Sequence, residues 1–221
     1  MVTRASLTDS KNSSTARTSA EGRSLRVMHV ITDLEVGGAE RMLVSYLTAP
    51  RKISVDCYVV SLLSGGFFAT VLRNSGIRVY EMKMGRAIGN LLSLFRMAAM
   101  IRREKPDIIQ SWLYHADLLS TLALLLSGRI RKTRLFWGVR CSDMDTNRYR
   151  MTLKIAIWGC SWLSWIPDGI IANSHAGMSV HKKLGYHPAK FFVIPNGVDT
   201  ERFTPDEGLR REVRKELDIP E

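Results

Sequence analysis

Apolar residues from position 25 onward alternate between short unbroken runs and longer segments with helical spacing. The short runs have the length of buried strands and predict strands at residues 27–31, 55–63, 77–84, 107–112, 135–139, 169–172 and 191–194. The segments between them carry apolar residues three or four positions apart and predict helices at residues 42–47, 67–72, 88–103, 116–126, 149–166 and 175–184. Apolar strands separated by helices indicate a parallel sheet that is covered on both faces.

This alternation predicts an α/β fold with a Rossmann-like, doubly wound, mostly parallel sheet. Residues 25–198 are expected to form one domain, preceded by a disordered leader at 1–24 and followed by a linker with a short charged helix at 199–221. Ligands of such sheets bind beyond the carboxyl ends of the strands, so the loops that follow the strands are the first candidates for a site.

The charge of the chain narrows the range of partners. Its 221 residues include 32 Lys and Arg against 21 Asp and Glu, a formal net charge of +11. Residues 25–198 hold 23 basic and 11 acidic residues, so the excess belongs to the folded part. Such a surface favours phosphorylated substrates, anionic lipid or nucleic acid. No helix-turn-helix, zinc or aromatic RNA-binding motif is present in the sequence, so nucleic acid is not expected as a partner.

Composition also limits cofactors and cellular location. The three cysteines, Cys57, Cys141 and Cys160, have neither a disulfide pattern nor metal-ligand spacing. No acidic pair is spaced like a metal clamp, and the glycine spacing differs from the dinucleotide fingerprint, so neither a metal nor a cofactor is expected. No apolar run reaches the roughly 18 residues of a membrane span, and no signal-peptide core opens the chain. We therefore expect a cytoplasmic protein.

The loop after the first predicted strand contains Gly37 and Gly38 directly before a helix. Glycines let the backbone approach a ligand closely, and a helix N-terminus offers unpaired N–H groups to a phosphate or an anionic sugar. A tight turn that needs positive φ explains the same residues, and both interpretations stay open.

Other candidate residues follow later strands. Arg140 and Asp143 come after the fifth predicted strand, where an arginine can hold a phosphate through two parallel hydrogen bonds; a surface ion pair is the alternative. His115 follows the fourth strand and is either a ligand-binding side chain or a structural hydrogen-bonding group. Asn196 and Gly197 form a turn dipeptide after the last strand, which by default steers the chain out of the domain.

Basic residues gather in two further places. Helical spacing puts Arg96 and Arg103 on one face of segment 88–103 together with Ser93 and Met100, opposite an apolar face of Leu91, Leu94, Phe95, Ala98 and Ile101. A second cluster contains Arg129, Arg131, Lys132 and Arg134. These are either solvated surfaces or a membrane patch, in which each basic residue near anionic lipid contributes about 1 kcal/mol.

Three tryptophans, Trp158, Trp162 and Trp165, recur at helical spacing in the apolar segment 149–166. Packing in the core is the first expectation, because large aromatic side chains dominate core energetics. An exposed surface for a membrane or a second domain is the alternative.

Four sequence blocks resemble glycosyltransferase family 4 and stand in that family's order. They are the Gly-Gly-Ala-Glu-Arg loop at 37–41, Pro-Asp-Ile-Ile-Gln-Ser-Trp-Leu-Tyr-His-Ala-Asp at 106–117, Trp-Gly-Val-Arg leading to Ser-Asp at 137–143, and Ile-Pro-Asn-Gly-Val-Asp at 194–199. The resemblance implies the amino-terminal, acceptor-side half of a retaining enzyme of GT-B fold, with the carboxyl-terminal donor domain missing. It also implies that Gly37 and Gly38 face the cleft and help hold the donor's phosphates or the acceptor.

The implied reaction moves a sugar from a nucleotide-sugar co-substrate to a glycan or glycolipid acceptor, in cell-surface polysaccharide or lipopolysaccharide synthesis on the inner face of the plasma membrane. Relatives often carry a histidine at the end of the fourth strand. Here that position is Trp112, and His115, three residues on, is the candidate that contacts the acceptor. A non-catalytic subunit that binds acceptor or membrane and recruits a separate donor-binding chain is the alternative.

Overall fold

A computed structural model of the protein describes residues 24–50, 53–85, 91–142, 149–201 and 203–220. One sheet runs through the molecule in the order β3-β2-β1-β4-β5-β6-β7, and all six pairings are parallel. Its strands are β1 (Leu25–Ile31), β2 (Val55–Ser61), β3 (Arg78–Glu81), β4 (Ile108–Trp112), β5 (Arg134–Val139), β6 (Gly169–Ala172) and β7 (Phe191–Val193). The predicted fold class is therefore confirmed.

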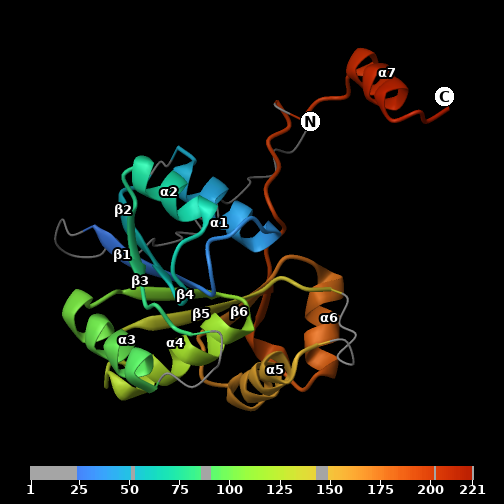
Figure 1. Cartoon of the computed structure of the whole chain (residues 1–221). Helices are drawn as coiled ribbons and strands as arrows, with labels where there is room; N and C mark the ends of the chain where they lie inside the picture. Colours follow the sequence, from blue (N-terminus) through green and yellow to red (C-terminus); the bar gives the residue numbers. More distant parts are fainter. Residues whose placement is uncertain (1–23, 51–52, 86–90, 143–148, 202, 221) are drawn as a thin grey trace, which may run out of the picture.

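Helices cover the two faces of the sheet in separate groups (Figure 1). They are α1 (Gly38–Thr48), α2 (Phe67–Asn74), α3 (Leu91–Glu104), α4 (Tyr114–Leu126), α5 (Met151–Leu163) and α6 (His175–Lys183). A further helix, α7 (Glu207–Glu216), lies apart from the sheet. The chain steps outward from β1 to β3 and then returns beside β1 at β4, stepping the other way. Because these crossovers are right-handed, α1 and α2 lie on one face and α3, α4 and α5 lie on the other.

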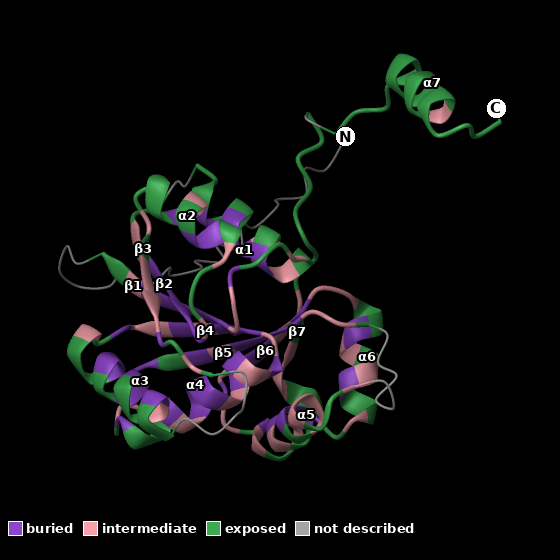
Figure 2. Cartoon of the chain, in the orientation of Figure 1, coloured by how far each residue is buried: buried purple, intermediate pink, exposed green. Residues whose placement is uncertain are grey.

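Each face has its own apolar core (Figure 2). Leu43 of α1 and Phe68 of α2 pack on Val59 in the smaller core. The larger core lies under α3, α4 and α5 and includes Trp137 and Ile101. Helices α1 and α2 cover only one end of their face of the sheet, so apolar side chains near the other end stay exposed. Phe192 and Ile194 there are 54% and 55% exposed. The fold thus leaves an open apolar surface beside its carboxyl edge.

The predicted faces of α3 are wrong in part. Ser93 and Met100, expected among the polar residues, are buried, whereas Leu91 and Phe95, expected in the core, are exposed. The buried stripe consists of Ser93, Met97, Ala98, Met100 and Ile101. Contact with α4 selects this stripe, and several apolar residues of α3 therefore remain at the surface.

The expectation that the three tryptophans pack in the core is also wrong. The exposed fractions of Trp158, Trp162 and Trp165 are 71%, 73% and 63%. Helix α5 instead buries Ala156, Ile157 and Cys160. A Cβ on Gly159 would meet the Leu118 side chain of α4 at 3.3 Å. Small residues therefore line the close contact between the two helices, and tryptophan is too large for it.

Further predictions concern the ends of the chain and one loop. The predicted leader and Asp143 lie outside the described residues, apart from Ser24. Helix α7 buries none of its residues. Within the described ranges, no helix combines the length and the apolar character that crossing a bilayer requires.

Candidate functional site

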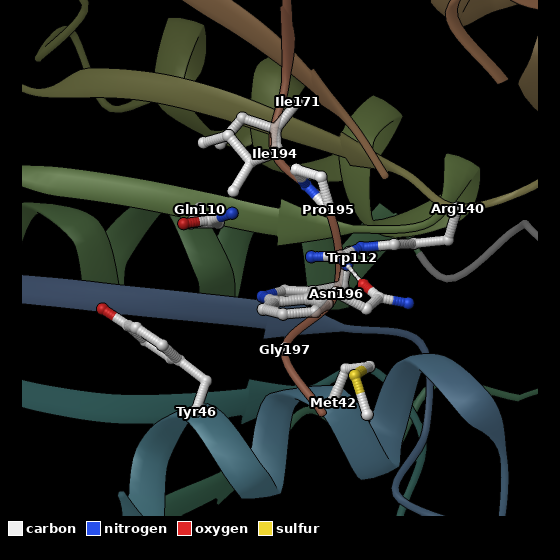
Figure 3. Close-up of a pocket in the computed structure, with 10 residues that line it drawn as sticks. All are labelled: Met42, Tyr46, Gln110, Trp112, Arg140, Ile171, Ile194, Pro195, Asn196 and Gly197. Atoms are coloured by element: carbon white, nitrogen blue, oxygen red, sulfur yellow. Dashed lines mark hydrogen bonds between the residues drawn. The ribbon is translucent and has the colours of Figure 1, made fainter. Parts of the chain in front are cut away.

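A pocket of about 230 Å³ opens at the carboxyl edge of the sheet, next to the point where the strand order reverses between β1 and β4. Helix α1 contributes one wall, the end of β4 contributes the floor, and segments after β5 and β7 close the other side (Figure 3). The lining residues are Met42, Tyr46, Gln110, Trp112, Arg140, Ile171, Ile194, Pro195, Asn196 and Gly197. Two predicted site residues, Arg140 and Asn196, therefore meet in one place.

Arg140 is the charged group of this pocket. Its guanidinium carbon lies 4.3 Å from the centre of the Trp112 ring, and its Nη1 donates a hydrogen bond of 2.6 Å to Oδ1 of Asn196. The same guanidinium keeps one buried donor, Nε, without a hydrogen bond. Burial lowers the pKa of Arg140, while the nearby charge of Asp117 opposes that change. The side chain is thus held in place, and an oxygen of a ligand would satisfy its free donor.

Trp112 supports the Arg140 guanidinium, which lies over the face of its ring. Its indole is 3% exposed, and its Nε1 donates a hydrogen bond of 3.3 Å to Nδ1 of His29 in β1. The His29 ring makes an edge contact with Tyr46 of α1 at 5.5 Å between centroids. These contacts tie the pocket floor to both β1 and α1, so Trp112 is a fixed platform and not a mobile lid.

A buried carboxyl group lies behind the pocket. Asp117, in the first turn of α4, is fully buried and accepts a hydrogen bond of 2.6 Å from Oγ of Ser111. Burial raises the pKa of Asp117 well above its usual range, although the bonds from Ser111 and the Gly138 backbone and the charge of Arg140 act in the opposite direction. Asp117 therefore links the interior of the domain electrostatically to the pocket arginine.

Replacing Asp117 with asparagine tests this buried carboxyl group. Its folded pKa lies above the unfolded value, so its contribution to stability is present below the unfolded pKa and is lost as the pH rises toward the folded one. We expect D117N to gain stability relative to the wild type as the pH rises from about 4.5 to about 7.5. Urea denaturation at both pH values measures the difference. A difference that does not change with pH would contradict the raised pKa.

The glycine loop stands at the same edge but does not line the pocket. Gly37 is the N-cap of α1 in an extended conformation with φ −151°, so the interpretation as a tight turn that needs positive φ is wrong for this residue. A Cβ on Gly37 would collide with the carboxylate of Glu40, which folds back over the loop. Burial raises the pKa of Glu40. Gly38 has open space around it, so the loop's role in ligand binding stays a prediction.

The remaining candidates are dispersed. His115 lies in the first turn of α4 and is half-buried, but it is not among the residues that line the pocket. Burial lowers its pKa and so favours the neutral imidazole. The basic residues Arg96, Arg103, Arg129, Arg131 and Lys132 belong to α3 and to the segment between α4 and β5. In the described part of the chain, no three His, Cys, Asp or Glu side chains gather closely enough to hold a metal ion.

Sequence reasoning did not identify Tyr46, Gln110 or Ile171 as site residues. Tyr46 has the spacing of an ordinary amphipathic helix, and the other two lie inside apolar strands. The sequence did indicate Trp112, because it is the last residue of a predicted strand, and such positions lie at the carboxyl edge of the sheet. Only the packing of α1 over β4 reveals that these side chains meet.

The fold and the pocket define an α/β domain with a pocket at the carboxyl edge of a parallel sheet. The model of Glycosyltransferase Family 4 matches residues 36–202, and the chain belongs to that family. No curated protein matched this sequence.

Solved structures with the same fold come from several sugar-processing proteins. Anabaena Alr3699/HepE, solved in complex with UDP, superposes with a TM-score of 0.67 at 18% identity over 88% of this chain and 50% of that one. The lipopolysaccharide outer core galactosyltransferase WaaB superposes with a TM-score of 0.58 at 13% identity, over 79% of this chain and 46% of that one. UDP-N-acetylglucosamine 2-epimerase from Rickettsia bellii superposes with a TM-score of 0.56 at 17% identity, over 90% of this chain and 52% of that one. The chain therefore spans about half the length of these structures.

Proposed function

We propose that this chain forms the acceptor-side wall of a retaining glycosyltransferase crevice, whose donor-binding wall is supplied by a second domain or a second chain. Arg140 carries the proposal, because Trp112 and Asn196 hold it at an open pocket with one buried donor unused. Membership of Glycosyltransferase Family 4 supports sugar transfer as the reaction class. Half-length coverage of the matching structures supports a division of labour between two domains.

The proposed reaction uses a nucleotide sugar as donor and a glycan or glycolipid as acceptor. The bond between the sugar's anomeric carbon and the diphosphate breaks, and its electron pair leaves with the diphosphate. An acceptor hydroxyl oxygen bonds to the anomeric carbon, and its proton passes to an oxygen of the departing diphosphate. A fixed guanidinium stabilises negative charge that develops on a departing group without having to reorganise. We assign this role, or the binding of an anionic group on the acceptor, to Arg140.

Two other parts of the domain fit acceptor binding. Tyr46 presents a half-exposed aromatic ring at the pocket mouth, where a sugar face can pack against it. Burial lowers the pKa of His115 and favours its neutral form, which can accept a hydrogen bond from a sugar hydroxyl. We propose that Gly37 and Gly38 approach the donor from the α1 side of the same edge. Positioning both substrates accounts for a large part of the expected rate enhancement.

We further propose a role in cell-surface polysaccharide or lipopolysaccharide synthesis. WaaB, one of the proteins with this fold, is named as a lipopolysaccharide outer core galactosyltransferase. The net charge of +11 suits acceptors that carry phosphate or lie at an anionic leaflet.

Calorimetric titration tests the division of labour. We expect the purified chain to bind oligosaccharide acceptors weakly and to show no tight binding of UDP-glucose or other nucleotide sugars. Joined to a donor domain of the same family, it should transfer sugar to a soluble acceptor. Tight donor binding by the chain alone would overturn the proposed division. Acceptor binding without any transfer in the joined protein would favour the alternative of a non-catalytic recruiting subunit.

A further inference from the structure

The outer surface of α5 carries a continuous apolar stripe. The stripe begins with Met151 and Ile155, which are 67% and 54% exposed. It continues with Trp158, Trp162 and Trp165. Successive members are three or four positions apart, so all five lie on one side of the helix and the turn that follows it. A soluble surface rarely exposes so many large apolar side chains in one row, and such a patch indicates a docking surface.

The tryptophans border a shallow groove of about 430 Å³ that is completed by Gly185, His187 and Pro188. Its two serine hydroxyls are already used inside the protein. Ser161 Oγ donates to the Leu184 carbonyl at 2.8 Å, while Ser164 Oγ donates to the Ser161 carbonyl at 2.7 Å and accepts from the His187 N–H at 2.8 Å. The groove therefore suits apolar material better than a hydrogen-bonding ligand.

The surroundings of this stripe are strongly basic. Segment 149–167, which contains α5, has no Asp or Glu, and residues 118–198 hold 11 Lys and Arg against three Asp. Lys182 and Lys183 are exposed in the last turn of α6, which ends two residues before the groove residue Gly185. Arg131 and Lys132 are exposed in the segment before β5. Arg134, the first residue of β5, forms an ion pair with Asp168, which lies three residues after Trp165. Exposed lysines of α6 thus lie close in sequence to the groove that the tryptophans border.

We propose that the α5 stripe docks on the surface of an anionic phospholipid membrane, with the tryptophan rings at the level of the headgroups and the neighbouring lysines and arginines facing lipid phosphates. Tryptophan prefers this interface because its ring is large and apolar but its N–H needs a polar partner. Basic residues are attracted to anionic leaflets. A second copy of the chain fits this surface less well, because pairing would bring two basic surfaces together.

The orientation of α5 connects this surface to the pocket. The helix starts after β5, at the carboxyl edge, and runs back toward the start of β6 at the opposite edge. A domain lying on α5 would therefore hold its carboxyl edge beside the leaflet. A lipid-linked acceptor could reach the pocket from there, and this last step rests on the proposed function, whereas the docking surface does not.

Vesicle sedimentation with the full chain tests the docking surface. We expect binding to vesicles that contain about 30% phosphatidylglycerol and little binding to pure phosphatidylcholine. The triple variant W158A/W162A/W165A should bind anionic vesicles at least about tenfold more weakly, because three exposed rings no longer leave water. The double variant K182E/K183E should bind anionic vesicles at least about tenfold more weakly than the wild type. This difference in binding should become smaller at high salt. Bromine-labelled lipids should quench the tryptophan fluorescence of the wild-type chain.

Phe67→Ala is the matched control, because Phe67 is 61% exposed on α2, on the other face of the sheet. It should bind vesicles like the wild type, and all variants should keep the wild-type circular dichroism spectrum. Unchanged vesicle binding by the triple variant would overturn the proposal. A concentration-dependent dimer that the triple variant dissociates would also overturn it in favour of a second copy. Both assays omit the donor and the acceptor, so their failure is distinct from a failure of sugar transfer.

Discussion

Replacing Trp137 with alanine should lower the free energy of unfolding by about 3–5 kcal/mol, the cost typical of removing a large aromatic side chain from a core. Trp137 is fully buried in β5, and its Nε1 donates a hydrogen bond of 3.0 Å to Oγ1 of Thr121 in α4. It also makes an edge contact with Tyr186. The variant loses this packing and leaves a cavity between the sheet and α4. Urea denaturation followed by circular dichroism measures the change.

Trp158→Ala is the control for this prediction, because it removes the same side chain from a surface position. Trp158 is 71% exposed, so its replacement should change the free energy of unfolding by no more than about 0.5 kcal/mol. Since domains of this size are commonly stable by about 5–15 kcal/mol, the Trp137 variant should be markedly destabilised while the Trp158 variant is not. Equal effects of the two substitutions would contradict the described burial of these residues.

Replacing Arg140 with alanine should weaken acceptor binding, or transfer in the joined protein, by about 10- to 100-fold, the range expected for hydrogen bonds to a charged group. The variant removes the only charged side chain among the pocket-lining residues described. Arg140→Lys should recover part of the loss, because lysine keeps the charge but cannot reproduce the planar contact with Trp112. Calorimetry with oligosaccharides and rate measurements with a soluble acceptor give the two readouts.

Two further variants separate charge in the pocket from charge on the surface. Asn196→Ala removes the hydrogen bond of 2.6 Å to Arg140 but leaves the contact with Trp112, so we expect a smaller loss than for Arg140→Ala. Arg73→Ala removes an exposed arginine that pairs with Glu81 and does not line the pocket, and it should behave like the wild type. Normal acceptor binding by Arg140→Ala would exclude this pocket as the acceptor site.

The local pattern of the sequence was sufficient to predict the sheet and its approximate strands. Residues 169–172 were predicted as a strand with the observed bounds, and α4 begins at Tyr114, two positions before the predicted start. Parallel strands that are buried on both faces need unbroken apolar runs, and right-handed crossovers leave few ways to order them. The fold class therefore follows from the periodicity of apolar residues.

Within the candidate site, the sequence located the edge but not the full set of contacts. Arg140 was found because it directly follows a predicted strand, and Asn196 because it belongs to a turn dipeptide shortly after the last predicted strand. Their hydrogen bond joins residues 56 positions apart, and nothing in either local sequence specifies it. Gly37 is a different case, because a short motif predicted close approach of a ligand and the structure shows only that the Glu40 carboxylate lies against that glycine. Its role in ligand binding stays a prediction.

The sequence by itself determined the parallel α/β architecture, the edge of the sheet at which the pocket lies and the excess of positive charge, because these depend on local periodicity, chain topology and composition. Only the tertiary structure decided which side of α3 and α5 faces inward, and that Arg140 lies on Trp112. An apolar helix with candidate residues on several sides can be buried in more than one rotation. The choice depends on the shape of the neighbouring helix, and α5 turned its small residues toward α4 and its tryptophans toward solvent.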